Sequence, residues 1–428
     1  MNPSVELSVI LPAHNEGRNL AVLLPRLRQV LAEIGVGAEI LLVVRARDEE
    51  TLRAAGTSGA QVIEQLSPGY GGALRTGFAL SRSRYLLTMD ADLSHEPRFV
   101  ADLWNARGSG EVLIASRYVA GGAATMPLGR RVLSRLLNRV FARGLGFRVR
   151  DVSSGFRLYD ARALQGIDLS ASDFDILQEI LVKIHMQGWR VREIPFAYAP
   201  RAFGSSNARV IPFGLSYLRT FYSLWKLRNS ILSADYDDRA FDSPIPLQRY
   251  WQRERFRLIT DSIPPGTRTL DVGCGSSRII GALPPGSVAV DVLLRKLRYA
   301  RRFDRSLVQA SGFSLPFAAE SFPCVVCSQV IEHVARESPI IDELCRVLMP
   351  GGRLILGTPD YGGWQWPLFE AAYAKLAPGG YADEHVTHYT REQLVDLFRR
   401  REYTLEASHY ILGAELVLVL RKPGGARP

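Results

Sequence analysis

The segment YLLTMDADLSHEP, residues 85–97, carries the signal on which the interpretation of the first half of the chain depends. Its first five residues have the apolar character of a buried strand, and Asp90 and Asp92 follow with one alanine between them. Acidic residues commonly end strands and cap the next turn. Two carboxylates at the C-terminal end of an α/β strand also suit Mg²⁺ or Mn²⁺, which prefer hard oxygen ligands. The pair alone does not decide between these interpretations, so the neighbouring sequence must.

The sequence around this segment alternates strand-like and helix-like stretches. From residue 6 to about residue 230, apolar runs such as LSVILP, EILLVV and EVLIAS are separated by amphipathic or glycine-rich segments. This alternation predicts an α/β fold with a largely parallel sheet. It stops in the acidic, proline-flanked stretch 229–249 and then begins again. We therefore expect a first domain at residues 1–228, a linker at 229–249 and a second α/β domain at 250–428.

Length and composition agree with two globular domains. The chain has 428 residues, of which 47% are hydrophobic and 22% are charged, and no apolar run approaches the roughly 18–20 residues that span a bilayer. The N-terminus shows no basic leader with a long apolar core, so we expect no signal peptide. All four cysteines lie in the second half and suggest no disulfide framework, which indicates a reducing compartment. These features predict a cytoplasmic protein.

Positive charge is concentrated in the first half. The net charge is +10, and nine arginines but only one acid, Asp151, fall between Arg117 and Arg157. Such a bias predicts an anionic partner: phosphates on a small molecule, a membrane surface or nucleic acid. The sequence carries no signature of a nucleic-acid-binding module. We therefore expect phosphates or anionic lipid and exclude nucleic acid.

Several further motifs arrive in an order known from one family of transferases. They are SVILPAHNEGRNL, PGYGGALRTGFAL, the MDAD run, ASRYVAGG, DVSSGFRLYD and RAFGSSN. In this order they resemble glycosyltransferase family 2, most closely the dolichyl- and polyprenyl-phosphate mannosyl- or glucosyltransferases, over roughly residues 5–210. The resemblance implies an A-type glycosyltransferase fold that binds a nucleotide-sugar donor.

The same resemblance implies roles for individual residues. It makes Asp90 and Asp92 the carboxylates that hold Mg²⁺ or Mn²⁺ and the donor diphosphate. We expect the donor to be bound by Pro12, Asn15, Glu16, Gly71, Arg75, Asp90, Arg117, Arg131 and Gln178. We expect the catalytic residues to be Asp92, Arg157, Glu179 and Arg201.

Residue chemistry supports a phosphate site beside this resemblance. The run GYGGALRTG, residues 69–77, offers backbone that a ligand can approach closely, and it opens a helix whose N-terminus favours anions. Arginine side chains are planar forks suited to phosphate oxygens. The arginines expected to act in this way are Arg117, Arg131, Arg157 and Arg201.

The acceptor determines whether a general base is needed. A phosphate monoester has a second pKa of about 6 and is already nucleophilic at pH 7, whereas a sugar hydroxyl needs a base. The resemblance implies a polyprenyl-phosphate acceptor, which needs no base, and direct displacement would invert the anomeric carbon. An alternative is a sugar or small-molecule acceptor, with Asp173, Asp175 or Glu179 as the base.

Two departures from the family affect the donor site. Val44 and Arg45 stand where relatives carry acids that hold the base and ribose, and Asp48 or Glu49 is expected to substitute for them. Ser206–Asn207 replaces the usual Ser-Lys pair, which removes a phosphate contact. A third interpretation follows: a degenerate, non-catalytic module that brings substrate to the second domain.

The stretch VIPFGLSYLRTFYSLWKLR, residues 210–228, combines aromatic residues at helical spacing with three cations. It predicts either an interfacial helix on anionic lipid or an ordinary helix that packs on its own domain. The first alternative would place the protein peripherally on the cytoplasmic face of a membrane.

The second half opens with TLDVGCGSS, an apolar strand followed by an acid and a glycine-rich turn. A dinucleotide fingerprint would require a third glycine, but Arg278 occupies that position. Asp271, two residues before the first glycine, suits a cationic cofactor. Asp291 ends the next strand, where an acid can accept both ribose hydroxyls.

Together with LPFAAESFPCVVCSQVIEHV, ELCRVLMPGGRLILGTP and EHVTHYTREQL, this opening resembles the class I S-adenosylmethionine-dependent methyltransferases of the small-molecule type. The resemblance covers about residues 250–422 and implies a Rossmann-like fold. It also implies that Asp271, Gly273, Gly275 and Asp291 bind S-adenosylmethionine.

Other features of this half have two interpretations each. Cys324 and Cys327 form a C-x-x-C within an expected buried strand, without a second pair, so we expect core packing and no metal site. Glu332–His333, His385 and His388 are candidates to orient the acceptor or to act as a base. The aromatic stretch 361–385 is expected to cover an acceptor pocket.

The leading hypothesis is a bifunctional enzyme. The first domain transfers a sugar from a nucleotide donor to a polyprenyl phosphate, and the second methylates a small molecule of the same glycan or lipid pathway.

Overall fold

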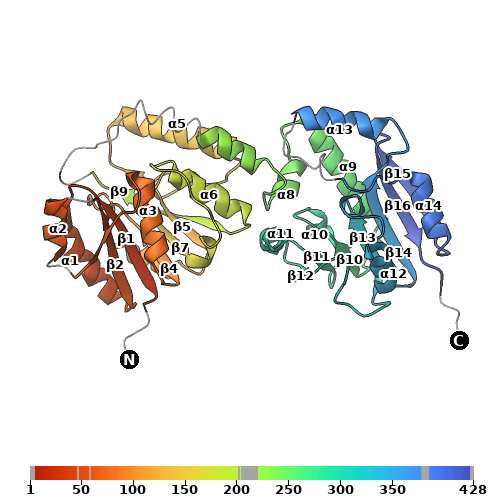
Figure 1. Cartoon of the computed structure of the whole chain (residues 1–428), viewed down its shortest axis with the longest axis horizontal. Coiled ribbons are helices and arrows are strands. Elements are labelled where there is room, and N and C mark those ends of the chain that lie inside the picture. The colour runs from red at the N-terminus through yellow and green to blue at the C-terminus, as the bar shows by residue number, and fades with distance from the viewer. Residues whose placement is uncertain are drawn as a thin grey trace. The chain divides into compact units, whose positions relative to one another are not determined.

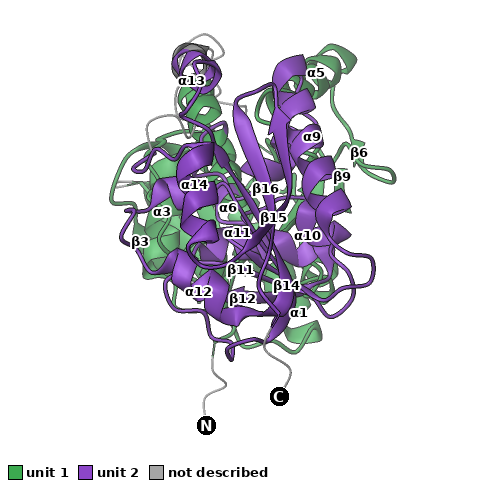
Figure 2. Ribbon diagram, turned by 90° about the vertical axis from the view of Figure 1, so that its right-hand side faces the viewer, with its two compact units in different colours: residues 1–185, 189–228 green, residues 186–188, 229–428 purple. Residues whose placement is uncertain are grey.

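The computed structural model divides into two compact units, residues 1–185 with 189–228 and residues 186–188 with 229–428 (Figure 2). Each unit is built on one seven-stranded sheet flanked by helices (Figure 1). The residues described by the structure are 5–45, 48–56, 59–200, 203, 220–376 and 385–424, with residues 372–376 described by their backbone only.

The first sheet has the strand order β3-β2-β1-β4-β7-β5-β8. Its strands are β1 (Leu7–Ala13), β2 (Ala38–Val44), β3 (Gln61–Glu64), β4 (Tyr85–Thr88), β5 (Val112–Ser116), β7 (Arg157–Asp160) and β8 (Val191–Pro195), while β6 (Ala123–Ala124) pairs with β9 (Ala197–Tyr198). The helices are α1 (Gly17–Glu33), α2 (Glu49–Gly56), α3 (Gly69–Leu80), α4 (Phe99–Asn105), α5 (Leu128–Gly144) and α6 (Ile176–Met186), with a 3-10 turn η1 (Ala161–Ala163).

The sheet is parallel except for β7, which runs antiparallel to β4 and β5. Its central strands are apolar because both faces are covered: Leu7, Val9 and Leu11 of β1 are wholly buried in the core. From β1 the chain builds β2 and β3 on one side, then crosses to β4 on the other. The carboxyl ends of β1 and β4 therefore flank a point where the strand order reverses, where α/β sheets bind their ligands.

The second sheet has the order β12-β11-β10-β13-β14-β16-β15. Its strands are β10 (Thr269–Val272), β11 (Val288–Asp291), β12 (Ser306–Gln309), β13 (Phe322–Ser328), β14 (Leu348–Pro359), β15 (Thr404–Ile411) and β16 (Glu415–Arg421). The helices are α8 (Tyr236–Phe241), α9 (Pro246–Ser262), α10 (Ile279–Ala282), α11 (Leu294–Ala300), α12 (Ile340–Val347), α13 (Gln365–Leu376) and α14 (Arg391–Arg399), with 3-10 turns η2 (Arg301–Phe303) and η3 (Ile331–His333).

Strand β16 is antiparallel to both of its neighbours, and the other strand pairs are parallel. Here the order reverses between β10 and β13, so the loops after these two strands flank the expected cofactor crevice. Cys324 and Cys327 of β13 are both buried, and they belong to two different apolar clusters. Each thiol thus packs in the core of the second unit.

The stretch 229–249, expected to be a linker, contains α8 and the beginning of α9 and belongs to the second compact unit. Tyr236 and Asp238 of α8 are buried, and Arg278 donates to Asp238 at 2.7 Å. The acidic composition that suggested a solvated linker instead supplies the carboxylates that bind this unit's own basic side chains.

Helices long and apolar enough to cross a bilayer do not occur among the described residues.

Candidate functional site

The two carboxylates of the opening segment lie directly after β4 and are held by hydrogen bonds. Asp92 is buried, and its Oδ1 accepts from the backbone N–H of Ser94 at 3.0 Å and from the Ser94 hydroxyl at 2.5 Å. Asp90 is half-buried, and its Oδ1 accepts from the Tyr70 hydroxyl at 3.3 Å. Hard oxygen ligands fixed at the point where the strand order reverses fit Mg²⁺ or Mn²⁺.

His95 is a positioning residue for this pair that the sequence interpretation missed. Its buried ring stacks on Phe156 at 4.8 Å between centroids, and its Nδ1 accepts from the backbone N–H of Asp90 at 2.9 Å. Burial lowers the pKa of His95, although Asp90 and Asp92 oppose this, so the ring is neutral and can accept. In the sequence, only the position of this histidine, three residues after Asp92, could have indicated its role.

The loop after β1 carries the residues expected around the nucleotide. Pro12 lies within β1 at its end, and Asn15 has a left-handed backbone with φ of 58°. The N–H of Asn15 donates to Asp48 Oδ2 at 2.7 Å, and that of Glu16 donates to Thr51 Oγ1 at 3.2 Å. Hydrogen bonds to Asp48 and Thr51, at the start of α2, therefore hold this loop in its conformation.

Asp48, expected to substitute for a ribose-binding acid, is buried and anchors this loop. Besides Asn15 it binds the Thr51 backbone and hydroxyl at 3.2 and 2.8 Å. Burial would raise the pKa of Asp48, but the bonds from Asn15 and Thr51 outweigh it and lower the pKa. Val44 is buried at the end of β2, whereas Arg45 and Glu49 are exposed.

Arg117 is engaged by a buried acid. Its guanidinium donates to both oxygens of Asp151 at 2.7 Å and to the Ser153 hydroxyl at 2.8 Å. Burial would lower the pKa of Arg117, but Asp151 outweighs it and raises the pKa. Arg131 lies on α5 and is half-buried.

Arg157 is not placed as predicted. Its side chain is 0% exposed, and its three donor groups bind the carbonyls of Ser154 at 2.7 Å and of Val152 and Leu177 at 2.8 Å. A wholly buried guanidinium with three of its five N–H groups bonded to backbone carbonyls offers no open face to a phosphate. The prediction of a catalytic phosphate contact is corrected: Arg157 ties the loop after residue 151 to the start of α6.

Three of the predicted site residues, Gly71, Arg75 and Glu179, contact one loop, residues 169–172. Glu179 accepts from the N–H groups of Ser170 and Ala171 at 3.1 and 2.9 Å, and Arg75 donates to the Leu169 carbonyl at 3.0 Å. A Cβ atom at Gly71 would lie 2.3 Å from the Ala171 carbonyl. Gly71 is therefore required for the close approach of this loop.

Glu179 is also paired with Lys183 at 2.7 Å. Burial would raise the pKa of Glu179, but Lys183 and the two amides outweigh it and lower the pKa. Gln178 is buried on the same turn of α6. Arg201 and Ser206–Asn207 lie outside the described residues.

The glycine-rich loop of the second unit follows β10. Gly273 and Gly275 have φ of 73° and 56°, which favour glycine. Asp291 Oδ2 accepts from the N–H of Gly275 at 2.8 Å, and its Oδ1 accepts from that of Leu293 at 2.7 Å. The end of β11 thus fixes the glycine loop in place.

Asp271 is the carboxylate that fits a cationic cofactor. It is buried, and among the described residues its Oδ2 has no hydrogen-bond partner. Burial, with a smaller effect of Asp291, raises the pKa of Asp271 to about 7. An unsatisfied buried acid beside two glycines suits the sulfonium and ammonium groups of S-adenosylmethionine.

Asp237 of α8 completes this loop and was missed because its stretch was taken as a linker. Its Oδ2 accepts from the backbone N–H and hydroxyl of Ser276 and from Lys296, each at 3.0 Å. A Cβ at Gly275 would lie 2.7 Å from the same oxygen. Burial would raise the pKa of Asp237, but Lys296 and Ser276 outweigh it and lower the pKa.

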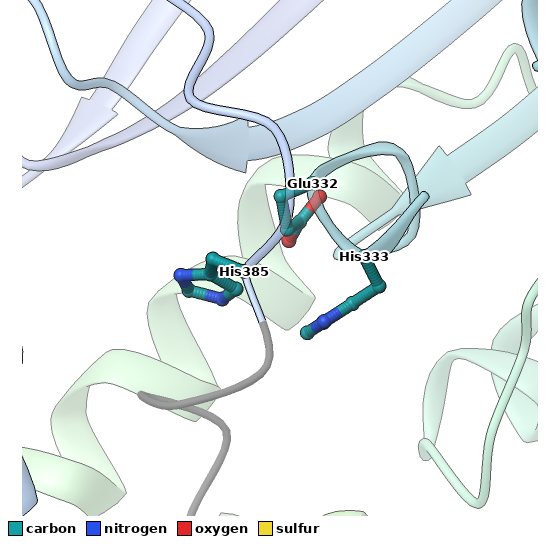
Figure 3. A group of neighbouring side chains, drawn as sticks. All are labelled: Glu332, His333 and His385. Atoms are coloured by element: carbon teal, nitrogen blue, oxygen red, sulfur yellow. The ribbon is translucent and has the colours of Figure 1, made fainter. Parts of the chain in front are cut away.

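The Glu332–His333 pair lies in η3, directly after β13, and His385 approaches it from a later part of the chain (Figure 3). One ligand atom from each residue lies within 4.8 Å of the others. A Cβ at Gly273 would lie 2.2 Å from Val330, so this cluster adjoins the glycine loop. His388 stacks on Tyr361, with 4.0 Å between centroids.

Burial governs the titration of this cluster. It raises the pKa of Glu332 to about 8 and lowers the pKa of His385. The stretch 361–385, expected to be a lid, forms α13 in its first part, and its residues 377–384 lie outside the described residues.

Comparison with known proteins assigns both units. The glycosyl transferase family 2 profile matches residues 8–167, and a methyltransferase domain profile matches residues 270–356. The dolichol-phosphate mannosyltransferase of Pyrococcus furiosus is 31% identical over 53% of this chain and 66% of its own length. The undecaprenyl-phosphate mannosyltransferase of Micrococcus luteus is 30% identical over 46% of this chain and 85% of its own length. The polyprenol monophosphomannose synthase of Mycolicibacterium smegmatis is 31% identical over 48% of this chain and 82% of its own length.

Solved structures also align with each unit. Glucosyl-3-phosphoglycerate synthase of Mycobacterium tuberculosis, solved with Mn²⁺ and UDP, aligns over 52% of this chain and 80% of its own, with 17% identity and a TM-score of 0.41. An S-adenosylmethionine-dependent methyltransferase of Thermotoga maritima aligns over 41% of this chain and 93% of its own, with 20% identity and a TM-score of 0.34.

The strand orders and the two profiles together confirm the predicted A-type glycosyltransferase fold and Rossmann-like class I methyltransferase fold. The chain belongs to glycosyl transferase family 2 and carries a methyltransferase domain in the same polypeptide.

Proposed function

We propose that the chain is a bifunctional transferase. Its first unit moves a sugar, with inversion, from a nucleotide donor to a polyprenyl phosphate, and its second unit methylates a small molecule of the same glycan or lipid pathway with S-adenosylmethionine. The observation that carries the first half is the pair of hydrogen-bonded carboxylates, Asp90 and Asp92, at the end of β4. A divalent cation bound there would neutralise charge on the leaving diphosphate.

Two of the three candidate bases are engaged in hydrogen bonds, which favours a phosphate acceptor. Glu179 is bound to Lys183 and two amides, which lower its pKa and make it a poor proton acceptor for a hydroxyl. Asp175 accepts from Thr220 at 2.8 Å, whereas Asp173 is exposed. A phosphate acceptor needs only alignment with the donor and screening of the charge between two anions.

Helix α5 supports the use of a lipid-borne acceptor. Its buried side carries Asn138, Phe141 and Ala142. Its apolar residues at helical spacing on the outside are between 45% and 65% exposed: Leu128, Val132, Leu133, Leu136, Leu137 and Val140. The helix contains no acid and carries Arg130, Arg131, Arg135, Arg139 and Arg143. Exposed aliphatic side chains among arginines match the interface of an anionic bilayer.

The helix that follows in this unit adds to that surface. Residues 220–228 are helical, and Phe221 packs on Phe141 of α5 with ring centroids 4.8 Å apart. Tyr222 and Trp225 are exposed, and Lys226 lies over the Tyr222 ring. This described part fits both alternatives for residues 210–228, because one side packs on the unit and the exposed aromatic side chains suit a membrane interface.

Replacing Leu133 and Leu136 by glutamate is expected to lower the partitioning of the full chain to vesicles containing phosphatidylserine at least about tenfold, because apolar insertion is lost and the added charge is repelled. Flotation measures this, with Leu66→Glu as the control because Leu66 is exposed elsewhere on the same unit. Equal flotation of the double variant and the control would refute a membrane role. A dimer that the same double substitution abolishes would instead make α5 a self-association surface.

The affinity for S-adenosylmethionine is expected to rise about tenfold per pH unit as pH approaches 7, and to level off above it. Below the Asp271 pKa of about 7 the carboxyl is neutral, and only above it does the anion attract the cationic cofactor. Calorimetric titration from pH 5.5 to 8.5 measures the dependence. Asp271→Asn should bind more weakly with a flat profile; an unchanged slope in this variant would locate the titrating group elsewhere.

The overall proposal is tested with full-length protein, Mg²⁺ or Mn²⁺, a short polyprenyl phosphate and a panel of labelled nucleotide sugars. Metal-dependent transfer of label into the organic phase supports the first activity and supplies a product to offer to the second with labelled S-adenosylmethionine. Nucleotide binding without transfer from any donor would leave the non-catalytic module as the better interpretation. Transfer to a sugar acceptor alone would favour the hydroxyl-acceptor alternative.

A further inference from the structure

The cluster of Glu332, His333 and His385 has the ligand set of a divalent metal site. Their ligand atoms lie within 4.8 Å of one another, and the three side chains point toward a common space (Figure 3). Two imidazoles and one carboxylate form a mixed nitrogen and oxygen set, which binds Zn²⁺, Mn²⁺, Fe²⁺ or Co²⁺.

Glu332 contributes an oxygen that forms no hydrogen bond with any described residue. The residue is wholly buried, its Oε2 accepts from the Thr358 hydroxyl at 3.1 Å, and among the described residues its Oε1 has no hydrogen-bond partner. Buried carboxylate oxygens are normally satisfied, because an unpaired one is costly. A cation at this position would satisfy Oε1 while the hydroxyl keeps the carboxylate oriented.

His385 is held in the manner of a metal ligand. Its Nδ1 lies 2.9 Å from Glu370 Oε1 and 2.8 Å from the Tyr361 hydroxyl. Metal-bound histidines usually donate their second nitrogen to a carboxylate, which fixes the ring and raises the basicity of the ligating nitrogen. With Nδ1 engaged by Glu370 and Tyr361, Nε2 is the atom left to face His333 and Glu332.

The cluster lies where a methyl acceptor would enter. Val330, directly before η3, contacts the position of Gly273, and η3 follows β13, the neighbour of β10 in the sheet. The loops after β10 and β13 flank the crevice of the second sheet. A cation held by the three residues would therefore be next to the proposed cofactor and open on the acceptor side.

We propose that Glu332, His333 and His385 bind one divalent cation that holds the hydroxyl of the methyl acceptor. Cation binding lowers the pKa of an oxygen ligand, so the hydroxyl proton leaves to solvent and the oxygen attacks the cofactor's methyl carbon. The new C–O bond forms as the C–S bond breaks, and its electron pair stays on sulfur. The role in methylation rests on the proposed function, whereas metal binding does not.

Co²⁺ titration of the metal-free full chain tests the site, because Co²⁺ bound by histidine nitrogens has a characteristic visible absorption. The Asp92→Asn variant is used as the background, so that the oxygen site of the first unit does not contribute. We expect one absorbing Co²⁺ per chain. The affinity for this Co²⁺ should fall at least about a hundredfold in His333→Ala and in His385→Ala. Glu370→Gln should weaken binding about tenfold to a hundredfold, as the loss of a supporting hydrogen bond does.

His409→Ala is the matched control, because His409 is exposed on β15 away from the cluster. It should bind Co²⁺ with unchanged affinity and spectrum. Absence of the band in the background protein, or equal binding by the control and by His333→Ala and His385→Ala, would overturn the site. Calorimetric binding of S-adenosylmethionine by each variant shows that the unit remains folded.

The same measurements separate the two proposals. Cofactor binding and methyl transfer without a Co²⁺ site would overturn the metal inference and leave the methyltransferase proposal intact. A histidine-dependent Co²⁺ site in a chain that binds no S-adenosylmethionine would overturn the methyltransferase proposal and leave metal binding intact.

Discussion

Replacing Asp92 by asparagine is expected to lower sugar transfer about a thousandfold, because a cation's stabilisation of the leaving group amounts to several kcal/mol. The amide has nearly the same shape, and its oxygen can still accept from Ser94, which bonds Asp92 Oδ1 in the native chain. The change therefore removes charge and one metal oxygen without removing the loop's internal bond. Transfer of labelled sugar at saturating donor and acceptor measures the effect.

Glu96→Gln is the control for this substitution, since Glu96 is an exposed acid in the same loop. It should leave transfer within about twofold of the native rate, because isolated surface substitutions have small effects. Methyl transfer by the second unit should be unchanged in both variants. An Asp92→Asn enzyme that retained more than a tenth of native transfer would rule out the carboxylate pair as the metal clamp.

Replacing Arg157 by methionine is expected to lower the free energy of unfolding of the first unit by about 3–5 kcal/mol. The substitution leaves the carbonyls of Val152, Ser154 and Leu177 buried without their donor, and each unsatisfied buried group destabilises by about 1–3 kcal/mol. Urea denaturation followed by hydrogen exchange of the first unit measures the loss. The sequence-based assignment to a phosphate predicts the opposite pattern: native stability with weakened donor binding.

Arg53→Met is the matched control, since the Arg53 side chain is 79% exposed and pairs with an exposed Glu49. It should change the free energy of unfolding by less than about 0.5 kcal/mol. If Arg157→Met were as stable as this control, its three carbonyl bonds would not be structural determinants.

The sequence predicted the features that depend on local order along the chain. Alternating apolar runs identified two α/β units, and the position of Asp90 and Asp92 after a buried strand placed them at the sheet edge where ligands bind. The glycines after β10 likewise signalled a turn with positive φ. In each case the property follows from residues adjacent in sequence.

The sequence could not predict which polar groups meet over long distances. Arg157 looked like a phosphate ligand because an arginine pattern does not reveal that Leu177, twenty residues away, will accept one of its donors. The loop 169–172 was invisible for the same reason, since its bonds come from Arg75 and Glu179 on two different helices. His95 required knowledge that its ring is buried against Phe156.

The bond from Asp237 to the glycine loop affects where the second unit can be separated from the first. Helix α8 is an N-terminal part of the methyltransferase domain, because Asp237 binds Ser276 and Lys296. A fragment that begins at residue 250, where the sequence pattern resumes, would lack α8 and the Asp237 carboxylate that holds the glycine loop. A fragment that begins at residue 229 keeps this carboxylate. The boundary of the second unit is therefore set by that carboxylate and precedes the apparent start of the second sheet.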